Sequence, residues 1–230
     1  MTRHAFGFIL ASALSLLASS ARAQTSNASR SPWSVGAHVT TVWHTDASHD
    51  VFAHEMAAPY GGFFVGRDLV TFAPRVVLSG ELAWSVNTVR RRLFSAFDST
   101  LHSNHFQAAV AVRFELNRWL SLYGRVAGGG TYFAATITGQ SSLDADAWTA
   151  NLTGGAGAFA VTPGILGSRV RFAAGVESGF AYVFPTDLAL APPVPEDDAK
   201  AADRLSVRPT ALGALDASGA YLRVTLGLRF

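Results

Sequence analysis

The sequence predicts an all-β protein, namely an eight-stranded antiparallel up-and-down transmembrane β-barrel. Three observations support this prediction. The chain has 230 residues, of which 49% are hydrophobic and only 15% charged, whereas soluble domains carry about 25% charged residues. Apolar side chains recur at every second position in several stretches, which is the period of a strand. Short turns alternate with longer links, as in barrels whose hairpins open toward one side of a membrane.

Composition excludes several other classes. Outside the N-terminus, the longest aliphatic stretch runs from Ala108 to Val112 and ends at Arg113, whereas a membrane helix needs about 20 apolar residues. The chain contains no cysteine, which excludes disulfides, thiol catalysis, cysteine-ligated zinc and an acylated N-terminal cysteine.

Residues 1–23 have the features of a secretory signal peptide. Arg3 and His4 precede an apolar stretch from Ala5 to Ala18, and Ala21-Arg22-Ala23 offers a small-residue cleavage site. We therefore expect export and cleavage before the barrel folds.

Residues 24–32 then form a short periplasmic segment, and residues 33–230 form the barrel. Cleavage removes Arg3 and Arg22 from the 18 Lys and Arg residues, which leaves 16 basic against 16 acidic residues and no net charge. A nucleic-acid partner is not expected, because such proteins need an excess of positive charge.

The alternation is clearest near the middle of the chain. Between Phe106 and Leu116 every second residue is apolar, while the other face carries Gln107, Arg113 and Glu115. The same pattern, read along the whole chain, predicts eight strands at residues 33–45, 59–70, 75–88, 104–116, 119–137, 148–160, 168–184 and 218–230. No helical segment is expected between them.

The links between these strands differ in length. Short links lie at 71–74, at 117–118 and around 162–164, and longer ones at 46–58, 89–103, 138–147 and 185–217. The last link holds five of the nine prolines. With both termini on the short-turn side, this arrangement predicts an even-stranded meander that closes as a barrel.

Aromatic residues mark the expected edges of a lipid-facing band. Trp33 and Trp43 share a face and lie ten residues apart, which projects to about 25 Å of barrel height at a strand tilt of ~40°. The expected girdle contains Tyr60, Trp84, Phe106, Tyr132, Trp148 and Phe184 on the loop side, and Phe72, Trp119, Phe172 and Phe230 on the turn side.

The opposite face of the strands is charged. It carries Glu81, Arg113, Glu115, Arg125, Arg171, Glu177, Arg223 and Arg229. Because eight strands leave an interior only wide enough for side chains to fill, we expect Glu81, Glu115 and Glu177 to pair with Arg113, Arg125, Arg171 and Arg223 as a plug. A pore or substrate path, and a secreted lipocalin-like barrel with these charges outside, are the alternatives.

The C-terminal strand carries a family resemblance. Leu222, Val224, Leu226 and Leu228 alternate toward a terminal Phe230, which resembles the assembly signal of bacterial outer-membrane barrels. Residues 33–230 as a whole resemble the OmpA/OmpX-like eight-stranded superfamily. The resemblance implies an outer-membrane address, insertion by the barrel assembly machinery, and contact with outer-membrane lipid and lipopolysaccharide. Nothing follows Phe230, so we expect no peptidoglycan-binding domain, and we expect a monomer.

Histidines raise the possibility of a metal site. His44, His49 and His54 accompany Asp46, Asp50 and Glu55 in the first long link, and His102 and His105 end the second. Imidazoles with carboxylates bind zinc or copper. The spacing fits no known ligand motif, so no metal ligand and no cofactor is assigned, and a metal-sequestering or narrow transport barrel is kept as an alternative.

Other fragments suggest chemistry less specifically. His102-Ser103-Asn104 is similar to the strand-borne His and Ser of outer-membrane lipid A deacylases, but adjacent residues point to opposite faces of a strand. No catalytic residue is therefore assigned and no enzyme is expected, with a lipid-modifying hydrolase as the alternative. Arg90-Arg91-Arg92 could bind lipopolysaccharide phosphates or face Glu196-Asp197-Asp198.

Two glycine clusters, Gly128-Gly129-Gly130 and Gly154-Gly155-x-Gly157, superficially suggest a phosphate loop. No helix is expected after either, and the Lys-Ser/Thr of such a loop is missing. They are predicted to be strand glycines that ease curvature or admit a large neighbour. The sequence thus predicts a plugged outer-membrane barrel with a structural, envelope-integrity or surface-interaction role.

Overall fold

The computed structural model describes residues 33–45, 51–52, 57–93, 96–139, 142–163, 170–191 and 210–230. Ten strands account for most of these residues. They are β1 (Trp33–His44), β2 (Ala57–Ala73), β3 (Val76–Leu93), β4 (Phe97–Glu115), β5 (Leu120–Thr138), β6 (Ser142–Val161), β7 (Arg171–Val183), β8 (Thr186–Leu190), β9 (Thr210–Leu215) and β10 (Gly219–Arg229).

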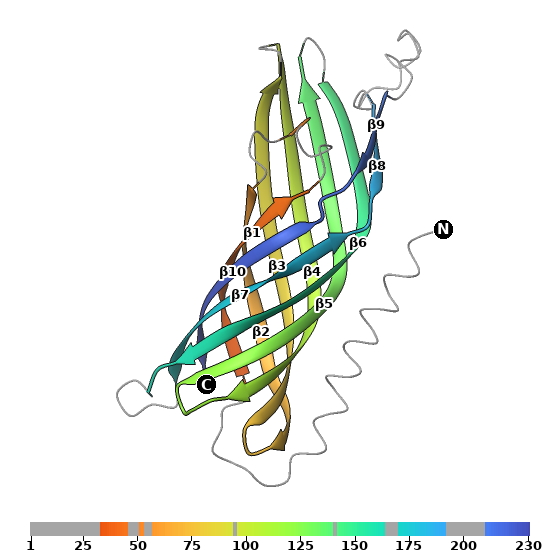
Figure 1. Cartoon of the computed structure of the whole chain (residues 1–230). Coiled ribbons are helices and arrows are strands. Elements are labelled where there is room, and N and C mark those ends of the chain that lie inside the picture. The colour runs from red at the N-terminus through yellow and green to blue at the C-terminus, as the bar shows by residue number, and fades with distance from the viewer. Residues whose placement is uncertain are drawn as a thin grey trace, which may run out of the picture.

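Eight of these strands close into a ring. Its order is β1-β10-β7-β6-β5-β4-β3-β2, and every neighbouring pair is antiparallel. β8 and β9 pair with each other as a separate two-stranded sheet, which lies beside β6 (Figure 1). The predicted all-β, eight-stranded up-and-down barrel is therefore confirmed.

The register fixes the dimensions of the ring. Successive partners lead from Arg67 on β2 around all eight strands and back to Ala57 on the same strand, ten residues away. A shear of ten with eight strands about 4.8 Å apart gives a tilt of about 41° and a backbone radius of about 8 Å. Side chains pointing inward fill a ring of this radius.

Four strands continue beyond the closed ring. β3 loses its partner on β2 beyond Val86, and β6 pairs with β7 only from Asn151 onward, while β3 to β6 remain paired with one another almost to their tips. Figure 1 shows these four strands rising above the ring. We call this part the extension; it comprises residues 87–93, 97–103, 131–138 and 142–150.

The extension corrects two predicted links. Residues 89–103 and 138–147 were expected to be long loops, but most of them are strand. The predicted link at 185–217 also contains β8 and β9. The predicted strands were recognised by apolar side chains on their outward face. These apolar side chains end where the extension begins, whereas the β-pairing continues into it.

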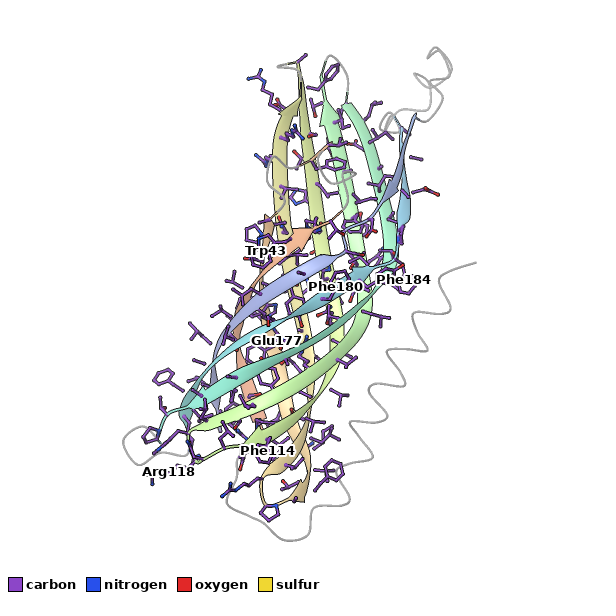
Figure 2. The ribbon with its side chains drawn as sticks, viewed as in Figure 1. Trp43, Phe114, Arg118, Glu177, Phe180 and Phe184 are labelled. Carbon is purple, nitrogen blue, oxygen red and sulfur yellow. The ribbon has the colours of Figure 1, made fainter. Side chains whose placement is uncertain are left out.

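Large apolar side chains cover the outside of the ring. Val39, Phe63, Val126 and Leu226 are each more than half exposed. In Figure 2, Trp43, Phe180 and Phe184 lie toward one end of this band and Phe114 toward the other. Trp33, Trp119, Phe172 and Phe230 lie near the turn-side end, as predicted.

One predicted girdle residue is misplaced. Tyr60 is buried inside the ring, where its aromatic ring meets the imidazole of His105 edge-on at 4.7 Å between centroids. Its side chain points inward from β2, as that of Phe64 does.

A row of aromatic rings lies on the outside of the barrel. The rings of Trp84, Phe106, Trp148 and Tyr132 are neighbours across β3 to β6. Across the described residues no helix is long and apolar enough to span a membrane.

Candidate functional site

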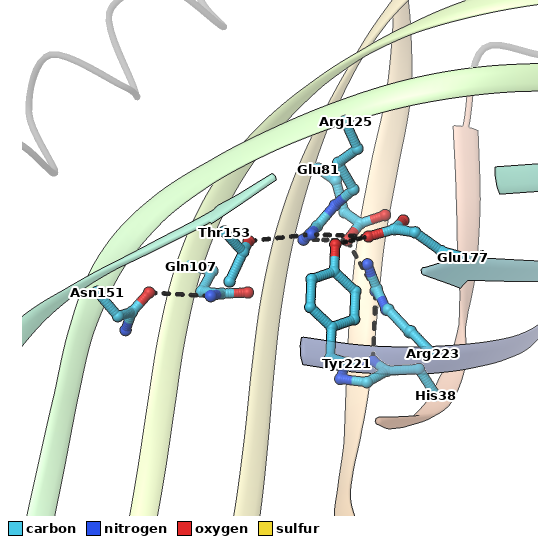
Figure 3. A network of polar contacts seen from close by, with 9 residues as sticks. All are labelled: His38, Glu81, Gln107, Arg125, Asn151, Thr153, Glu177, Tyr221 and Arg223. Atoms are coloured by element: carbon cyan, nitrogen blue, oxygen red, sulfur yellow. Dashed lines mark hydrogen bonds and ion pairs between the residues drawn. The ribbon is translucent and has the colours of Figure 1, made fainter. Parts of the chain in front are cut away.

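Buried ion pairs occupy the middle of the ring (Figure 3). The carboxylate of Glu81 accepts hydrogen bonds from the guanidinium groups of Arg125 at 3.1 Å and Arg223 at 2.8 Å. Arg125 also lies 3.6 Å from Glu177, which accepts a hydrogen bond from the hydroxyl of Tyr221. These two carboxylates and two guanidinium groups balance in charge, and they come from four different strands.

A second ion cluster lies nearer the turn side. Asp68 on β2 accepts from Arg113 at 2.9 Å and from Arg229 on β10. Sequence reasoning missed Asp68, although the inward phase of Tyr60, Phe64 and Asp68 along β2 could have revealed it. Its partners were predicted to face inward, and they do.

The predicted ion network is only partly correct. Glu81, Glu177, Arg125 and Arg223 form it as expected. Arg171 is exposed at the first position of β7, where the ring no longer encloses its side chain, and Arg113 pairs with the unforeseen Asp68.

Neutral hydrogen-bonding groups follow beyond the ion pairs. The amide of Gln107 donates to Asn151 at 2.9 Å, and the amide of Asn151 donates to Thr131 at 2.8 Å. The hydroxyl of Thr131 lies 3.0 Å from Nδ1 of His105. Along β4 and β5, the inward side chains therefore change from ion-paired to neutral and polar toward the extension.

Two small cavities remain in the lumen. One of about 50 Å³ is bounded by Tyr60, His105 and Arg223, and the other of about 80 Å³ by Asp68, Arg113 and Glu81. Because a water molecule needs roughly 10–15 Å³ of such space, each cavity has room for a few water molecules.

Strand glycines make room for the lumen side chains. A Cβ on Gly155 would lie 2.3 Å from the hydroxyl oxygen of Tyr221, and one on Gly157 would lie 2.9 Å from the ring of Tyr123. Both glycines belong to β6, and the Gly128-Gly130 cluster belongs to β5. Both clusters are strand glycines, as predicted, and Gly155 and Gly157 are positions at which a large neighbour is admitted, whereas a Cβ on Gly129 would meet the carbonyl oxygen of Phe106.

An apolar cluster, which we call the cap, fills the inner face of the extension. It contains Phe52, Leu101, Phe133, Ala135, Val183, Leu188, Leu215 and Ala217, all buried. Leu188 and Leu215 come from the β8–β9 pair, and the hydroxyl of Ser99 donates to the carbonyl oxygen of Val51 at 2.8 Å. Packed apolar side chains therefore lie at the loop-side end of the lumen.

The outer face of the extension is polar. Arg90 and Arg92 point outward from β3, Asp98 from β4, and Asp144 and Asp146 from β6. Thr100, Ala134 and Thr136 lie between these edges, and Asp187 on β8 extends the acidic side. Arg91 is half-buried on the opposite face, so only two of the three predicted arginines are displayed here. Residues 196–198, their suggested partners, lie outside the described residues.

The described histidines do not form a metal site. His44 is buried and its Nδ1 lies 3.1 Å from the carbonyl oxygen of Ala217, whereas His102 is exposed beside Thr88 and His105 points into the lumen. No group of three potential ligands occurs in the described part of the chain. His49, His54, Asp46, Asp50 and Glu55 lie outside it.

The geometry also separates the suggested catalytic fragment. His102 and Ser103 point to opposite faces of β4, as expected. Ser103 and His105 do share a face, a spacing that sequence reasoning overlooked, but that face is the buried interior of the ring. A lipid substrate outside the barrel would not reach them.

Comparisons with known proteins give distant matches among solved structures. No family model and no curated protein matches the chain. Among solved structures, it is similar to Ail, the attachment invasion locus protein of Yersinia pestis, in complex with the heparin analogue sucrose octasulfate. That match has 13% identity and a TM-score of 0.43, and covers 87% of this chain and 98% of Ail. A second Ail structure gives 15% identity and a TM-score of 0.42, over 88% and 99% of the two chains. These values identify neither a family nor a ligand, and the barrel fold rests on the strand order itself.

Proposed function

We propose that this chain is an exported outer-membrane barrel that does not conduct and that has a structural, envelope-integrity or surface-interaction role. One observation carries the proposal: buried ion pairs lie inside the ring, and large apolar side chains cover its outside. Soluble proteins rarely expose contiguous apolar patches beyond a few hundred Å². The arrangement fits a barrel surrounded by lipid.

Orientation follows from the strand lengths. Transmembrane barrels have short turns on the periplasmic side and longer structures outside, so the extension and the cap face the cell exterior. Residues 1–23 are the proposed signal peptide and residues 24–32 the periplasmic segment; both lie outside the described residues. Phospholipid and lipopolysaccharide contact the apolar band and its aromatic edges.

Epitope tags on intact cells test this orientation. Tags after Ser48, at Ala96 in the β3–β4 turn and near Ala199 should be reached by antibody, whereas tags at Asn117 or Gly164 should not. Ser99 is unsuitable for a tag, because it is fully buried and its hydroxyl donates to the carbonyl oxygen of Val51. Labelling at Asn117 on sealed cells would overturn the orientation.

Insertion by the barrel assembly machinery is part of the same proposal. Phe230 is exposed at the end of the apolar face of β10. Replacing it (Phe230→Asp) should lower the amount of heat-modifiable barrel in the membrane. Normal abundance of that variant would argue against Phe230 as an assembly signal.

Two closures in series support a non-conducting state. The ion pairs around Glu81 block the middle of the lumen, and the cap closes its outer mouth. The purified protein in planar bilayers should show no stable conductance, and liposomes carrying it should not swell in arabinose. Stable channels would favour the transport alternative. An enzymatic role has no support in the described geometry around Ser103 and His105.

A further inference from the structure

We infer that the outer face of the extension is a docking surface for a second copy of this chain in the same membrane. The inference rests on the proposed function, because it requires two copies inserted with the same orientation. It departs from the expectation of a monomer. The observation behind it is the division of charge across this face.

The charges lie at opposite edges of the face. Arg90 and Arg92 form the basic edge on β3, and Asp144 and Asp146 form the acidic edge on β6. The strand order places β4 and β5 between them. Asp98 on β4 lies 3.8 Å from Arg92, so the basic edge carries a net charge of +1 and the acidic edge a charge of −2.

A two-fold axis along the membrane normal brings these edges together. Two-fold dimers are the commonest closed assemblies, and this direction of the axis leaves both barrels inserted alike. Rotation about such an axis places β3 of one copy opposite β6 of the other. Arg90 and Arg92 of each copy then face Asp144 and Asp146 of its neighbour, so the face is complementary to itself.

The middle of the face permits close approach. Thr100 on β4 and Thr136 on β5 are direct partners in the register, and Ala134 lies next to them. All three side chains are small. His102, the register partner of Ala134, is bulkier, but its imidazole lies 2.7 Å from the hydroxyl of Thr88, toward the β3 edge of the face.

The charge balance favours a second copy over lipopolysaccharide phosphates. Two arginines stand against Asp98, Asp144 and Asp146, so the face has a net charge of −1, and Asp187 on the adjoining β8 makes it more acidic. A polyanion would meet repulsion over most of this surface, because like charges opposed across an interface are costly. A surface with the same two edges meets opposite charges.

The area indicates a weak dimer. Four strands about 4.8 Å apart and seven residues long at ~3.3 Å per residue present roughly 450 Å². A stable interface buries about 800 Å² per partner. Further contact would come from the row of aromatic rings immediately below, Trp84, Phe106 and Trp148.

The absence of cysteine makes a single-site crosslinking test possible. Thr136→Cys near the axis should be crosslinked by a bismaleimide that spans about 10 Å, the spacing of packed sheets. Thr45→Cys, at the end of β1 on the opposite side of the ring, is the matched control. Both proteins are reconstituted in phosphatidylcholine vesicles without lipopolysaccharide, and heat-modifiable gel migration is measured on the same samples.

Charge reversal then tests the edges in the Thr136→Cys background. The pair Arg90→Asp and Arg92→Asp, and separately the pair Asp144→Arg and Asp146→Arg, should each lower the crosslinked fraction about ten-fold, because like charges then face each other. Mixing these two variants in one vesicle should restore crosslinking, since each then meets its complement.

Three outcomes would overturn the inference. In the first, Thr136→Cys is crosslinked no more than Thr45→Cys. In the second, charge reversal leaves the crosslinked fraction unchanged. In the third, crosslinking requires added lipopolysaccharide and is not restored by mixing the two charge-reversed variants. The third would assign the face to lipid. Because migration reports insertion independently, loss of the dimer with an intact barrel leaves the proposed function standing, whereas absence of a heat-modifiable barrel would count against the proposed function itself.

Discussion

The lumen and the cap share the same strands but follow opposite rules. Along β4, Arg113 points into the ring and is ion-paired, whereas Leu101, twelve residues nearer the tip, points inward into an apolar cluster. Along β5, Arg125 and Phe133 show the same contrast. Every second side chain points inward along the whole of both strands, but these side chains are charged in the ring and apolar in the extension.

The environment outside each region explains the inversion. Around the ring the outward side chains are apolar, as the proposed lipid surroundings require, so the polar groups are on the inner face and must be paired. Around the extension the outward side chains are Arg90, Thr100 and Asp144, as water permits, so the inner face is apolar. The row of aromatic rings from Trp84 to Trp148 lies between the two regimes.

The largest expected effect comes from opening both regions at once. Glu81→Ala with Arg223→Ala removes a balanced pair from the lumen, and Leu101→Ser with Phe133→Ser makes the cap polar. Neither double variant should leak potassium from liposomes, because the other closure remains, whereas the quadruple variant should. Leak from the lumen variant alone would show that the cap is not a barrier.

A single lumen substitution should lower global stability strongly. Glu177→Ala removes the carboxylate that contacts Arg125 and Tyr221, and breaking a buried pair typically costs about 3–5 kcal/mol. Glu81→Ala should behave in the same way. Urea unfolding in vesicles measures the loss, and Asp144→Ala on the exposed edge should change stability by at most about 0.5 kcal/mol. Equal shifts in all three variants would contradict the ion-paired lumen.

A cap substitution should act locally instead. Leu215→Ala deletes a buried side chain that joins β9 to the cap, at a cost of about 2–5 kcal/mol. The β8–β9 pair should become more sensitive to protease while the urea midpoint of the barrel stays near that of the wild type. Ala214→Ser, at the exposed neighbouring position, is the control. A large fall in the barrel midpoint would show that the cap and the ring unfold as one unit.

The smallest effect is expected at the surface ion pair. Arg92 lies 3.8 Å from Asp98, with both side chains 71% exposed, and such pairs contribute about 0–1 kcal/mol. Arg92→Ala should therefore leave the urea midpoint almost unchanged, whereas Arg113→Ala, which leaves the less exposed Asp68 with one partner fewer, should lower it clearly. Similar shifts for the two would show that burial does not set the strength of these pairs.

Sequence reasoning succeeded where the chain repeats one rule over many residues. The period of two along Phe106–Leu116 and Leu222–Phe230 predicted strands, and the inward phase identified Glu81, Arg125, Glu177 and Arg223. It missed Asp68, although Asp68 shares the inward phase of Tyr60 and Phe64 along β2. It misplaced Tyr60, because an aromatic residue near a strand end can lie on either face of the strand.

The sequence by itself determined the strands, their alternation and the eight-stranded closed class, because these follow from local periodicity and link length. Only the tertiary structure decided which charges pair, since Glu81 meets Arg125 and Arg223 through the shear of the ring. It alone also revealed the extension and the cap. In the proposed orientation water replaces lipid outside these parts of the strands, so the outward apolar pattern ends although β-pairing continues. Leu101, Phe133, Leu188 and Leu215 are distant in sequence, and their common cluster depends on how the strands are brought together in space.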